Sequence, residues 1–371
     1  MATATSEDRL WMTAALALAR RGLGRVSPNP AVGCVVVAAG RAIGRGWTQP
    51  GGRPHAETEA LRRAGPAARG ATAYISLEPC SHHGKTPPCT DALIESGIKR
   101  CVISCEDPDP RVSGRGIAAL QQAGIDVEVG LCADTARELN RGFFLNKLTG
   151  RPLVSLKLAT SLDGRIALAS GESKWITGEA ARARAHLLRA SHDAILVGGG
   201  TALADNPRLD VRLPGLDARS PVRVVMDRRL QLPVEHDLVA QARIRPTLLF
   251  TAKQHDEAVL AGYRESGVEV VACEGADDDS RFPEVVLKAL AERGLTRLLL
   301  EGGAGTATSF LRAGLVDRLE WFRAPMLIGA DGLPGTGRLE LESLVQAPVF
   351  RREALEPLGE DLLERYRREA A

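Results

Sequence analysis

Short apolar runs alternate with helical patterns along this chain, and no other feature constrains its fold as strongly. In the first 150 residues, apolar runs typical of strands occupy positions 32–37, 71–77, 101–104 and 127–129. Helical patterns occupy positions 57–64, 90–96 and 116–123, after a first amphipathic helix at 10–19 that Ser6 would cap. This alternation predicts a three-layer α/β domain.

The alternation stops and then restarts, which predicts a second α/β domain. Residues 146–152 combine Asn, Thr, Gly and Pro as a connection between domains does. Beyond them, strands are predicted at 153–159, 194–197, 222–226, 247–250, 268–271 and 297–300. Helices are predicted at 179–190, 284–293 and 307–313. A length of 371 residues exceeds what one hydrophobic core usually serves. We therefore expect domains at residues 1–147 and 148–371.

Charge and composition exclude several classes of protein. The net charge is +2 and only 4% of residues are aromatic, so no extended basic groove or stacking platform for a polynucleotide is expected. No apolar run reaches the roughly 20 residues of a membrane-spanning helix. The seven cysteines are irregularly spaced and odd in number, which favours a reducing compartment. We expect a cytoplasmic protein that binds neither nucleic acid nor membrane.

A histidine, a glutamate and two cysteines follow the order of a zinc-deaminase site. His55 opens a helical pattern with Glu57 two residues later, and Cys80 and Cys89 come after a predicted strand. Catalytic zinc takes nitrogen and thiolate ligands and keeps a fourth position for water, whose pKa it lowers to about 7. We predict one zinc ion bound by His55, Cys80 and Cys89. Glu57 would carry the proton without binding the metal.

The spacing of the two cysteines departs from the common deaminase pattern. Eight residues separate Cys80 from Cys89, where two are usual. His82 and His83 lie in this loop and are alternative ligands, although a basic patch beside the metal is the favoured interpretation. A non-catalytic structural zinc module is a further alternative, but it would usually supply a fourth Cys or His and leave Glu57 without a purpose.

Three segments of the first half resemble one enzyme family. They are residues 28–33 (PNPAVG), 54–57 (PHAE) and 78–89 (EPCSHHGKTPPC). They are similar to the bifunctional deaminase/reductase of riboflavin biosynthesis, and the likeness extends through both halves. The resemblance implies a cytidine-deaminase-like first domain that removes an amino group from a phosphoribosylaminopyrimidine.

The same resemblance implies substrate contacts in the first domain. Asn29 would contact the pyrimidine, and Asp107 the ribose or base. A phosphorylated substrate needs cations near the metal, and Lys85 in the ligand loop suits this role. Two residues depart from the family: Asp109 stands where asparagine is frequent, and Thr48 where histidine is frequent. Both departures concern substrate contacts and not the chemistry.

The second half resembles the reductase domain of this family through residues 156–165 and 171–177. The resemblance implies a dihydrofolate-reductase-like fold and NADPH as the reductant that converts the ribosyl group to ribityl. The cofactor-binding residues that it implies are Ala159, Trp175, Thr201, Asp205, Gly303, Ala304, Gly305, Thr306, Ala307, Thr308 and Ser309. The substrate-binding residues that it implies are Ser173, Arg189, Leu209, Arg212 and Glu301.

Two glycine-rich loops, at 198–201 and 301–306, follow predicted strands. Such loops let backbone amides approach phosphate oxygens, although they also occur as turns without a ligand. Thr308 occupies the place of the third glycine of a Rossmann motif, so a conventional doubly wound dinucleotide domain is disfavoured. Arg228 and Arg229 follow another predicted strand and are candidates to favour NADPH over NADH.

Charged residues of the second half suggest both binding and catalysis. Arg189 and Arg212 suit a phosphate monoester, because a guanidinium binds two oxygens at once. Lys157 and Asp205 are candidates for the proton donor or electrostatic partner of the reduction, although such residues are often only solvent-facing or turn-forming.

Together, the motifs and the resemblance predict a bifunctional, homo-oligomeric enzyme of riboflavin biosynthesis. It would deaminate 2,5-diamino-6-(5-phosphoribosylamino)pyrimidin-4-one with zinc and then use NADPH to form 5-amino-6-(5-phosphoribitylamino)uracil. The alternative is a nucleoside or nucleic-acid deaminase with an accessory domain, or a non-catalytic zinc-binding module.

Overall fold

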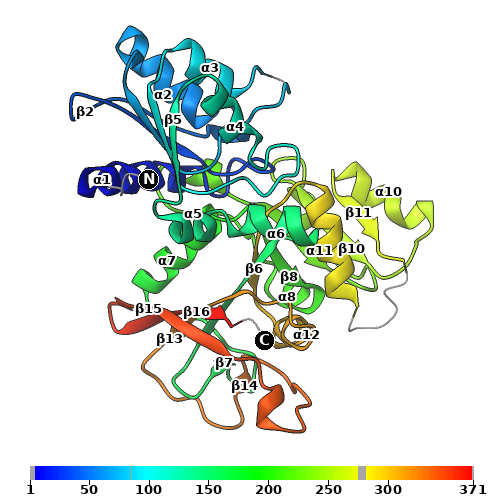
Figure 1. The fold of residues 1–371 in the computed structure, drawn as a ribbon. Coiled ribbons are helices and arrows are strands. Elements are labelled where there is room, and N and C mark those ends of the chain that lie inside the picture. Colours follow the sequence, from blue (N-terminus) through cyan, green and yellow to red (C-terminus); the bar gives the residue numbers. More distant parts are fainter. Residues whose placement is uncertain (1–4, 85, 275–280, 370–371) are drawn as a thin grey trace. The chain divides into compact units, whose positions relative to one another are not determined.

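The computed structural model describes residues 5–84, 86–274 and 281–369, and it divides the chain into two compact units (Figure 1). Unit 1 is Met1–Gly150 and unit 2 is Arg151–Ala371. Among the described residues, none of the helices combines the length and the apolar character that crossing a bilayer requires. The boundary near residue 147, with one activity on each side of it, stays a prediction.

Unit 1 is built on a five-stranded sheet in the order β2-β1-β3-β4-β5. The strands are β1 (Gly33–Ala38), β2 (Arg41–Trp47), β3 (Thr72–Ile75), β4 (Arg100–Ile103) and β5 (Asp126–Val129). β1 pairs antiparallel with β2 and β3, whereas β3, β4 and β5 run parallel. The carboxyl ends of β3 and β4 therefore open at one edge of the sheet.

The helices of unit 1 are α1 (Ser6–Ala19), α2 (Ala56–Ala64), α3 (Cys89–Glu95), α4 (Arg115–Gln122), α5 (Ala133–Leu139) and α6 (Arg141–Thr149). Short 3-10 turns are η1 (Arg20–Gly22), η2 (Pro50–Gly52) and η3 (Gly65–Ala68). The boundary between the two units, Gly150/Arg151, falls inside the predicted connection at 146–152. Its first residues belong to α6, which continues to Thr149 and ends with Gly150 in the left-handed conformation.

The predicted cap of the first helix is wrong. Ser6 is already helical, and Thr5 is the N-cap. The Thr5 hydroxyl accepts a hydrogen bond from the Asp8 backbone N at 3.1 Å, while the Asp8 carboxylate accepts from the Thr5 backbone N at 2.9 Å. This reciprocal capping box satisfies two backbone donors at the helix start, which Ser6 at that position would not do.

Glycines let two helices press directly onto the sheet of unit 1. A Cβ on Gly33 would lie 1.9 Å from the Ala15 carbonyl oxygen of α1, and one on Gly46 would lie 2.1 Å from the Ala56 carbonyl oxygen of α2. Gly46 pairs with Cys34, the residue after Gly33, so the two contacts lie on opposite faces of the sheet. The unit is therefore three-layered, as predicted.

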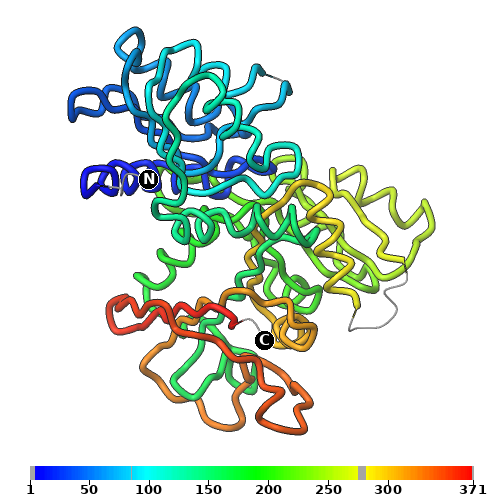
Figure 2. Tube along the Cα trace, in the orientation of Figure 1, coloured from blue at the N-terminus to red at the C-terminus, as the bar shows by residue number. Residues whose placement is uncertain are grey.

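Unit 2 contains a nine-stranded sheet in the order β11-β10-β9-β8-β12-β6-β13-β16-β15. Its strands are β6 (Leu153–Thr160), β8 (Ala194–Gly198), β9 (Val222–Met226), β10 (Thr247–Thr251), β11 (Glu269–Ala272), β12 (Arg297–Glu301), β13 (Arg318–Arg323), β15 (Phe350–Leu358) and β16 (Asp361–Arg368). Strands from β11 through β13 run parallel, and the β15–β16 hairpin adds to β13 antiparallel. This hairpin is the orange-red to red part of the chain trace in Figure 2.

The helices of unit 2 are α7 (Glu179–Ala190), α8 (Gly199–Asp205), α9 (Asp237–Ala240), α10 (Glu257–Glu265), α11 (Phe282–Glu292) and α12 (Ala304–Arg312). A small antiparallel pair joins β7 (Arg165–Ala167) to β14 (Leu333–Pro334), and 3-10 turns are η4 (Asp217–Arg219) and η5 (Leu344–Gln346). Leu298 and Leu300 of β12 join one apolar cluster and Leu299 the other, so the sheet is buried on both faces.

Candidate active sites

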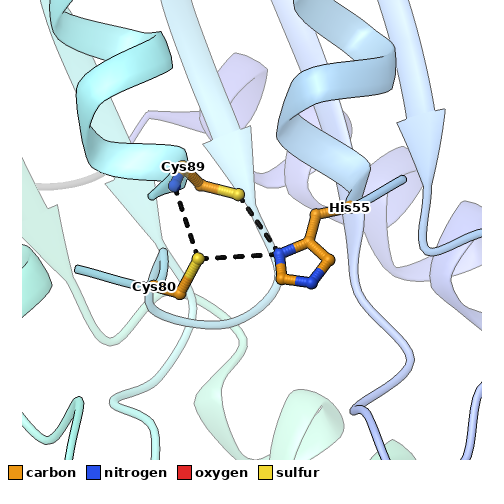
Figure 3. Close-up of side chains that lie close together, drawn as sticks. All are labelled: His55, Cys80 and Cys89. Carbon is orange, nitrogen blue, oxygen red and sulfur yellow. Dashed lines mark hydrogen bonds between the residues drawn. The ribbon is translucent and has the colours of Figure 1, made fainter. Parts of the chain in front are cut away.

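The three predicted metal ligands converge in unit 1 (Figure 3). His55 immediately precedes α2, Cys80 lies in the loop after β3, and Cys89 is the first residue of α3. Their ligand atoms all lie within 4.8 Å of one another. His55 Nδ1 is 3.6 Å from Cys80 Sγ and 3.3 Å from Cys89 Sγ. The eight-residue spacer therefore does not prevent the two cysteines from meeting.

The chemistry of this donor set fits zinc. One imidazole nitrogen and two sulfurs are ligands that zinc prefers, and three of them leave a fourth position open. The Cys89 thiol and the His55 ring lower the pKa of Cys80, which favours the thiolate that a metal binds. Among the described residues, neither His82 nor His83 joins this cluster or any other potential metal-binding group.

Glu57 lies in α2 next to the ligands and is 3% exposed. Burial raises the pKa of its carboxyl to about 7, although the neighbouring His55 opposes this shift. Glu57 lines a cavity of about 160 Å³ together with His55 and Cys80. A buried carboxyl that gains and loses a proton near neutral pH suits general acid-base catalysis.

The predicted pyrimidine contacts line the same cavity. Asn29 Nδ2 donates to the Gly52 carbonyl oxygen at 2.9 Å and lies 3.3 Å from His55 Nε2. Asp107 is buried, which raises its pKa to about 6. The Thr48 hydroxyl accepts from the Val32 backbone N and donates to the Pro30 carbonyl oxygen, so it holds the chain that carries Asn29. Lys85 lies outside the described residues.

Sequence reasoning missed Glu78, which positions the cavity wall. Its buried carboxylate accepts hydrogen bonds from four backbone N–H groups, at distances of 2.9–3.3 Å, of Asp107, Gly114, Gly116 and Ile117. It thereby ties the segment before Cys80 to the loop that carries Asp107. The only signal in the sequence is a glutamate directly before Pro-Cys, because the four partners are backbone groups that any residue could supply.

A second cavity, of about 970 Å³, lies in unit 2 at the carboxyl ends of β6, β8, β9 and β12. Ligands bind at this edge in open parallel sheets. The predicted cofactor residues that line it are Ala159, Thr201, Asp205, Gly303, Gly305, Thr306, Ala307, Thr308 and Ser309. Ala304 and Trp175 are not among its lining residues. Trp175 is 67% exposed, and the Arg182 guanidinium lies 4.6 Å from its ring centroid.

The two glycine-rich loops interlock at this cavity. A Cβ on Gly198 would lie 2.2 Å from the Thr306 hydroxyl, and one on Gly303, whose φ is +75°, would lie 2.7 Å from the Thr201 hydroxyl. Side chains at these positions would separate α8 from α12. The loops therefore bring backbone amides of both helix starts to one cavity, as a phosphate-bearing cofactor requires.

The predicted substrate residues of unit 2 form a charged cluster. Arg189 donates two hydrogen bonds of 2.8 Å to the Glu301 carboxylate and a third to the Asp210 carbonyl oxygen. Two of the N–H groups of Arg189 are therefore already bound to Glu301. Arg212 pairs with the Asp210 carboxylate at 2.6 Å and is half exposed, and Leu209 is buried.

Lys157 and Ser173 both line the cavity. Burial lowers the pKa of Lys157, and the Glu301 carboxylate opposes this shift. Burial also disfavours ionised Glu301, but Arg189 and Lys157 outweigh it and hold the pKa of Glu301 at about 2. Partly buried Lys157 of β6 thus pairs in register with buried Glu301 at the end of β12, and Lys157 lines the cavity that a ligand would enter.

Two family models match the chain. The cytidine and deoxycytidylate deaminase zinc-binding region matches residues 5–105, and the RibD C-terminal domain matches residues 152–363. The chain is 42% identical to the riboflavin biosynthesis protein RibD of Aquifex aeolicus over 97% of this chain and 98% of that protein. It is 43% identical to RibD of Escherichia coli over 96% and 98%.

Solved structures give the same result. RibD of Acinetobacter baumannii, form 1, superposes with a TM-score of 0.88 at 38% identity, covering 98% of this chain and 99% of that one. A diaminohydroxyphosphoribosylaminopyrimidine deaminase/5-amino-6-(5-phosphoribosylamino)uracil reductase of Thermotoga maritima has a TM-score of 0.86 at 37% identity, with the same coverage. The predicted α/β fold class and zinc-binding deaminase region are confirmed. The chain therefore belongs to the RibD family of riboflavin biosynthesis proteins.

Proposed function

We propose that this protein deaminates 2,5-diamino-6-(5-phosphoribosylamino)pyrimidin-4-one in residues 1–147 and reduces the ribosyl group of the product in residues 148–371. The observation that carries the proposal is that His55, Cys80 and Cys89 converge beside buried Glu57. The same chain also holds a large cavity lined by two glycine-rich loops. Membership of the RibD family implies zinc for the first reaction and NADPH for the second.

In the first site, His55, Cys80 and Cys89 would hold zinc, which supplies an activated water when it is bound. Water adds to the ring carbon that carries the amino group, the carbon–nitrogen bond breaks, and ammonia leaves. Glu57 takes a proton from the water and delivers it to the departing nitrogen. Asn29 and Asp107 orient the base, and Lys85 is proposed as a contact for the phosphate.

In the second site, the nine predicted cofactor residues that line the cavity would bind NADPH, which supplies a hydride when it is bound. Ala304 and Trp175 remain proposed cofactor contacts. Lys157 is the first candidate to donate a proton or to stabilise charge at the ribosyl group, and the Glu301 carboxylate favours its charged form. Asp205, at the end of α8, is the second candidate. Ser173, Leu209, Arg189 and Arg212 complete the proposed substrate site.

The function is tested by following both half-reactions with the zinc-loaded full chain. Supplied with the phosphoribosyl diaminopyrimidinone and NADPH, the enzyme should release one ammonia for each NADPH oxidised. Ammonia release from cytidine or a polynucleotide, with none from this substrate, would instead support the alternative of a nucleoside or nucleic-acid deaminase. Bound zinc without any ammonia release would support a non-catalytic module.

Arg212→Ala should weaken binding of the ribosyl phosphate in the reductase site by about 1.5–3 kcal/mol, the scale of a charge-assisted hydrogen bond. Arg212 is half exposed and paired only on one side with Asp210, so its guanidinium retains donors for a phosphate. The KM for the deaminated substrate should rise while ammonia release stays normal. Arg243→Ala, which removes an exposed arginine that donates to the Glu265 carbonyl oxygen, is the matched control. An unchanged KM for Arg212→Ala would contradict the assignment.

Arg228→Ala should reduce the preference for NADPH over NADH about tenfold or more, because NADPH carries an additional phosphate that a guanidinium binds. Arg228 lines the cavity, and its guanidinium lies 5.1 Å from the Phe282 ring centroid. Arg229 is exposed and is not among the lining residues, so Arg229→Ala is the control. The ratio of kcat/KM for the two cofactors is the measurement. An equal loss with both cofactors would exclude discrimination by Arg228.

We also propose a cytoplasmic homo-oligomer that acts on its small phosphorylated substrate without nucleic acid. All seven cysteines lie in the described residues, and all are free, which is compatible with a reducing compartment. Leu344 and Val345 in unit 2 are 91% and 94% exposed, and a subunit interface would cover such side chains. Light scattering of the purified chain measures the oligomeric state.

A further inference from the structure

Three charged side chains meet at one wall of the deaminase cavity. Asp109, Arg111 and Lys147 all line it, together with His55 and Glu57. Asp109 follows β4 in the loop that also carries Asp107, whereas Lys147 comes from the last turn of α6. Sequence reasoning noticed Asp109 only as a departure from the family and did not consider Lys147.

The Asp109 carboxylate is fully engaged by its neighbours. Oδ1 accepts hydrogen bonds from the backbone N of Arg111 at 3.0 Å and from its Nε at 2.9 Å. Oδ2 accepts from Arg111 Nη2 at 2.6 Å and lies 3.0 Å from Lys147 Nζ. Asp109 is only 5% exposed, and Arg111 holds its pKa well below the usual range. A carboxylate with four donors has little capacity left for a substrate N–H.

Lys147 is held in place, but these contacts do not occupy all of its N–H donors. Its Nζ lies 5.6 Å from the Phe143 ring centroid, and its side chain remains 28% exposed. An ammonium has three N–H donors, and Asp109 takes one of them. Asp107 lines the same cavity and adds a second carboxylate to this wall. The capacity of the wall to bind an anion therefore lies in the remaining N–H donors of Lys147.

The size of the cavity indicates where an anion would lie. At about 160 Å³, the cavity is smaller than the roughly 300–1,000 Å³ of pockets that enclose whole ligands. A pyrimidine that reaches His55 and Glu57 would fill it and leave the ribosyl phosphate at its edge. Lys147 and Arg111, whose side chain is 67% exposed, are partly open to solvent there.

We propose that Lys147, anchored by Asp109, binds the substrate phosphate in the deaminase site. This inference rests on the proposed deaminase function and adds a residue to it. In this chain the Asp109 carboxylate lies 3.0 Å from Lys147 Nζ and anchors a mobile point charge at the edge of the cavity. Lysine suits this task because its ammonium contacts phosphate without demanding a fixed geometry.

The test uses Lys147→Met, which keeps a long unbranched side chain and removes the charge. Lys99→Met, at an exposed lysine outside the cavity lining, is the matched control. Ammonia release is measured on the zinc-loaded full chain with the phosphoribosyl diaminopyrimidinone and with its dephosphorylated counterpart. We expect Lys147→Met to raise KM about tenfold or more for the phosphorylated substrate, with kcat nearly unchanged. The dephosphorylated substrate should show no such difference, and zinc content should stay at the parent value.

Two outcomes would overturn the proposal. An equal rise in KM for both substrates would mean that Lys147 only positions the loop with Asp107, and an unchanged KM for both would exclude any contact. If the parent enzyme releases no ammonia from either substrate, the proposed deaminase function itself is wrong, which is a result distinct from these two.

A double variant tests the role of Asp109. If Asp109 acts by anchoring Lys147, Asp109→Asn should raise KM for the phosphorylated substrate, and combining it with Lys147→Met should cost no more than the more damaging single change. If the double variant raises KM by the product of the two single effects, the anchoring role is contradicted.

Discussion

Glu57→Gln should lower the rate of ammonia release by a factor of about 100 or more, the scale of lost general acid-base catalysis. Glutamine preserves the shape of the side chain but cannot carry a proton between the water and the departing nitrogen. Because Glu57 is buried, solvent water cannot easily replace it. Both half-reactions are measured on this variant and on Glu95→Gln, an exposed glutamate of α3 that serves as the control.

Reduction of an already deaminated substrate should continue in Glu57→Gln at the parent rate. The residues proposed for reduction, among them Lys157 and Glu301, all belong to unit 2, whereas Glu57 belongs to unit 1. If Glu57→Gln abolishes NADPH oxidation when the deaminated substrate is supplied directly, the proposal of two separate sites is wrong.

Cys89→Ser should remove most of the zinc and reduce deamination by at least 100-fold. A serine hydroxyl stays protonated at neutral pH and is a poor replacement for a thiolate ligand. The measurements are zinc per chain by elemental analysis and ammonia release. Cys132→Ser changes a half-buried cysteine outside the ligand cluster, and it should retain both properties.

Full zinc and full deamination in Cys89→Ser would contradict the ligand assignment. His82, which lines the cavity, and His83 would then be the next candidates. Loss of zinc with an intact reductase half-reaction would separate a local metal defect from unfolding of the whole chain.

Inner strands and amphipathic helices were predictable from the sequence. The strand at Val222–Met226 and the helix at Glu179–Ala190 have the predicted bounds, because continuous burial and amphipathic periodicity are both local patterns. The metal ligands were predictable for a similar reason, since His55, Glu57, Cys80 and Cys89 are distinctive residue types in a fixed order.

Strands without an apolar run were not predicted. β2 carries Arg41, Arg45 and two glycines and has only two buried residues, so no apolar run marks it. The β15–β16 hairpin is largely charged and was also missed. These three strands depend on pairing with neighbouring strands, which a local pattern does not reveal.

The missed site residues share one property: their partners are distant in the sequence. Lys147 meets Asp109 across 38 positions, and Glu78 meets backbone N–H groups 29–39 positions away. Arg189 and Glu301 were predicted as separate site residues, but their pairing, which spans 112 positions, was not. A single sequence shows which residues are charged, but only the folded chain shows which charges neutralise each other and which remain for a ligand.

The close approach of α2 to β2 requires a glycine at position 46, and the metal site depends on this requirement. The Ala56 carbonyl, which would collide with a Cβ on Gly46, belongs to the residue directly after His55. Any side chain at position 46 would push the start of α2 away from the sheet and carry the imidazole with it. Zinc affinity in this protein therefore depends on position 46, which does not touch the metal. A search for altered deaminases among natural variants should include strand β2 as well as the metal ligands.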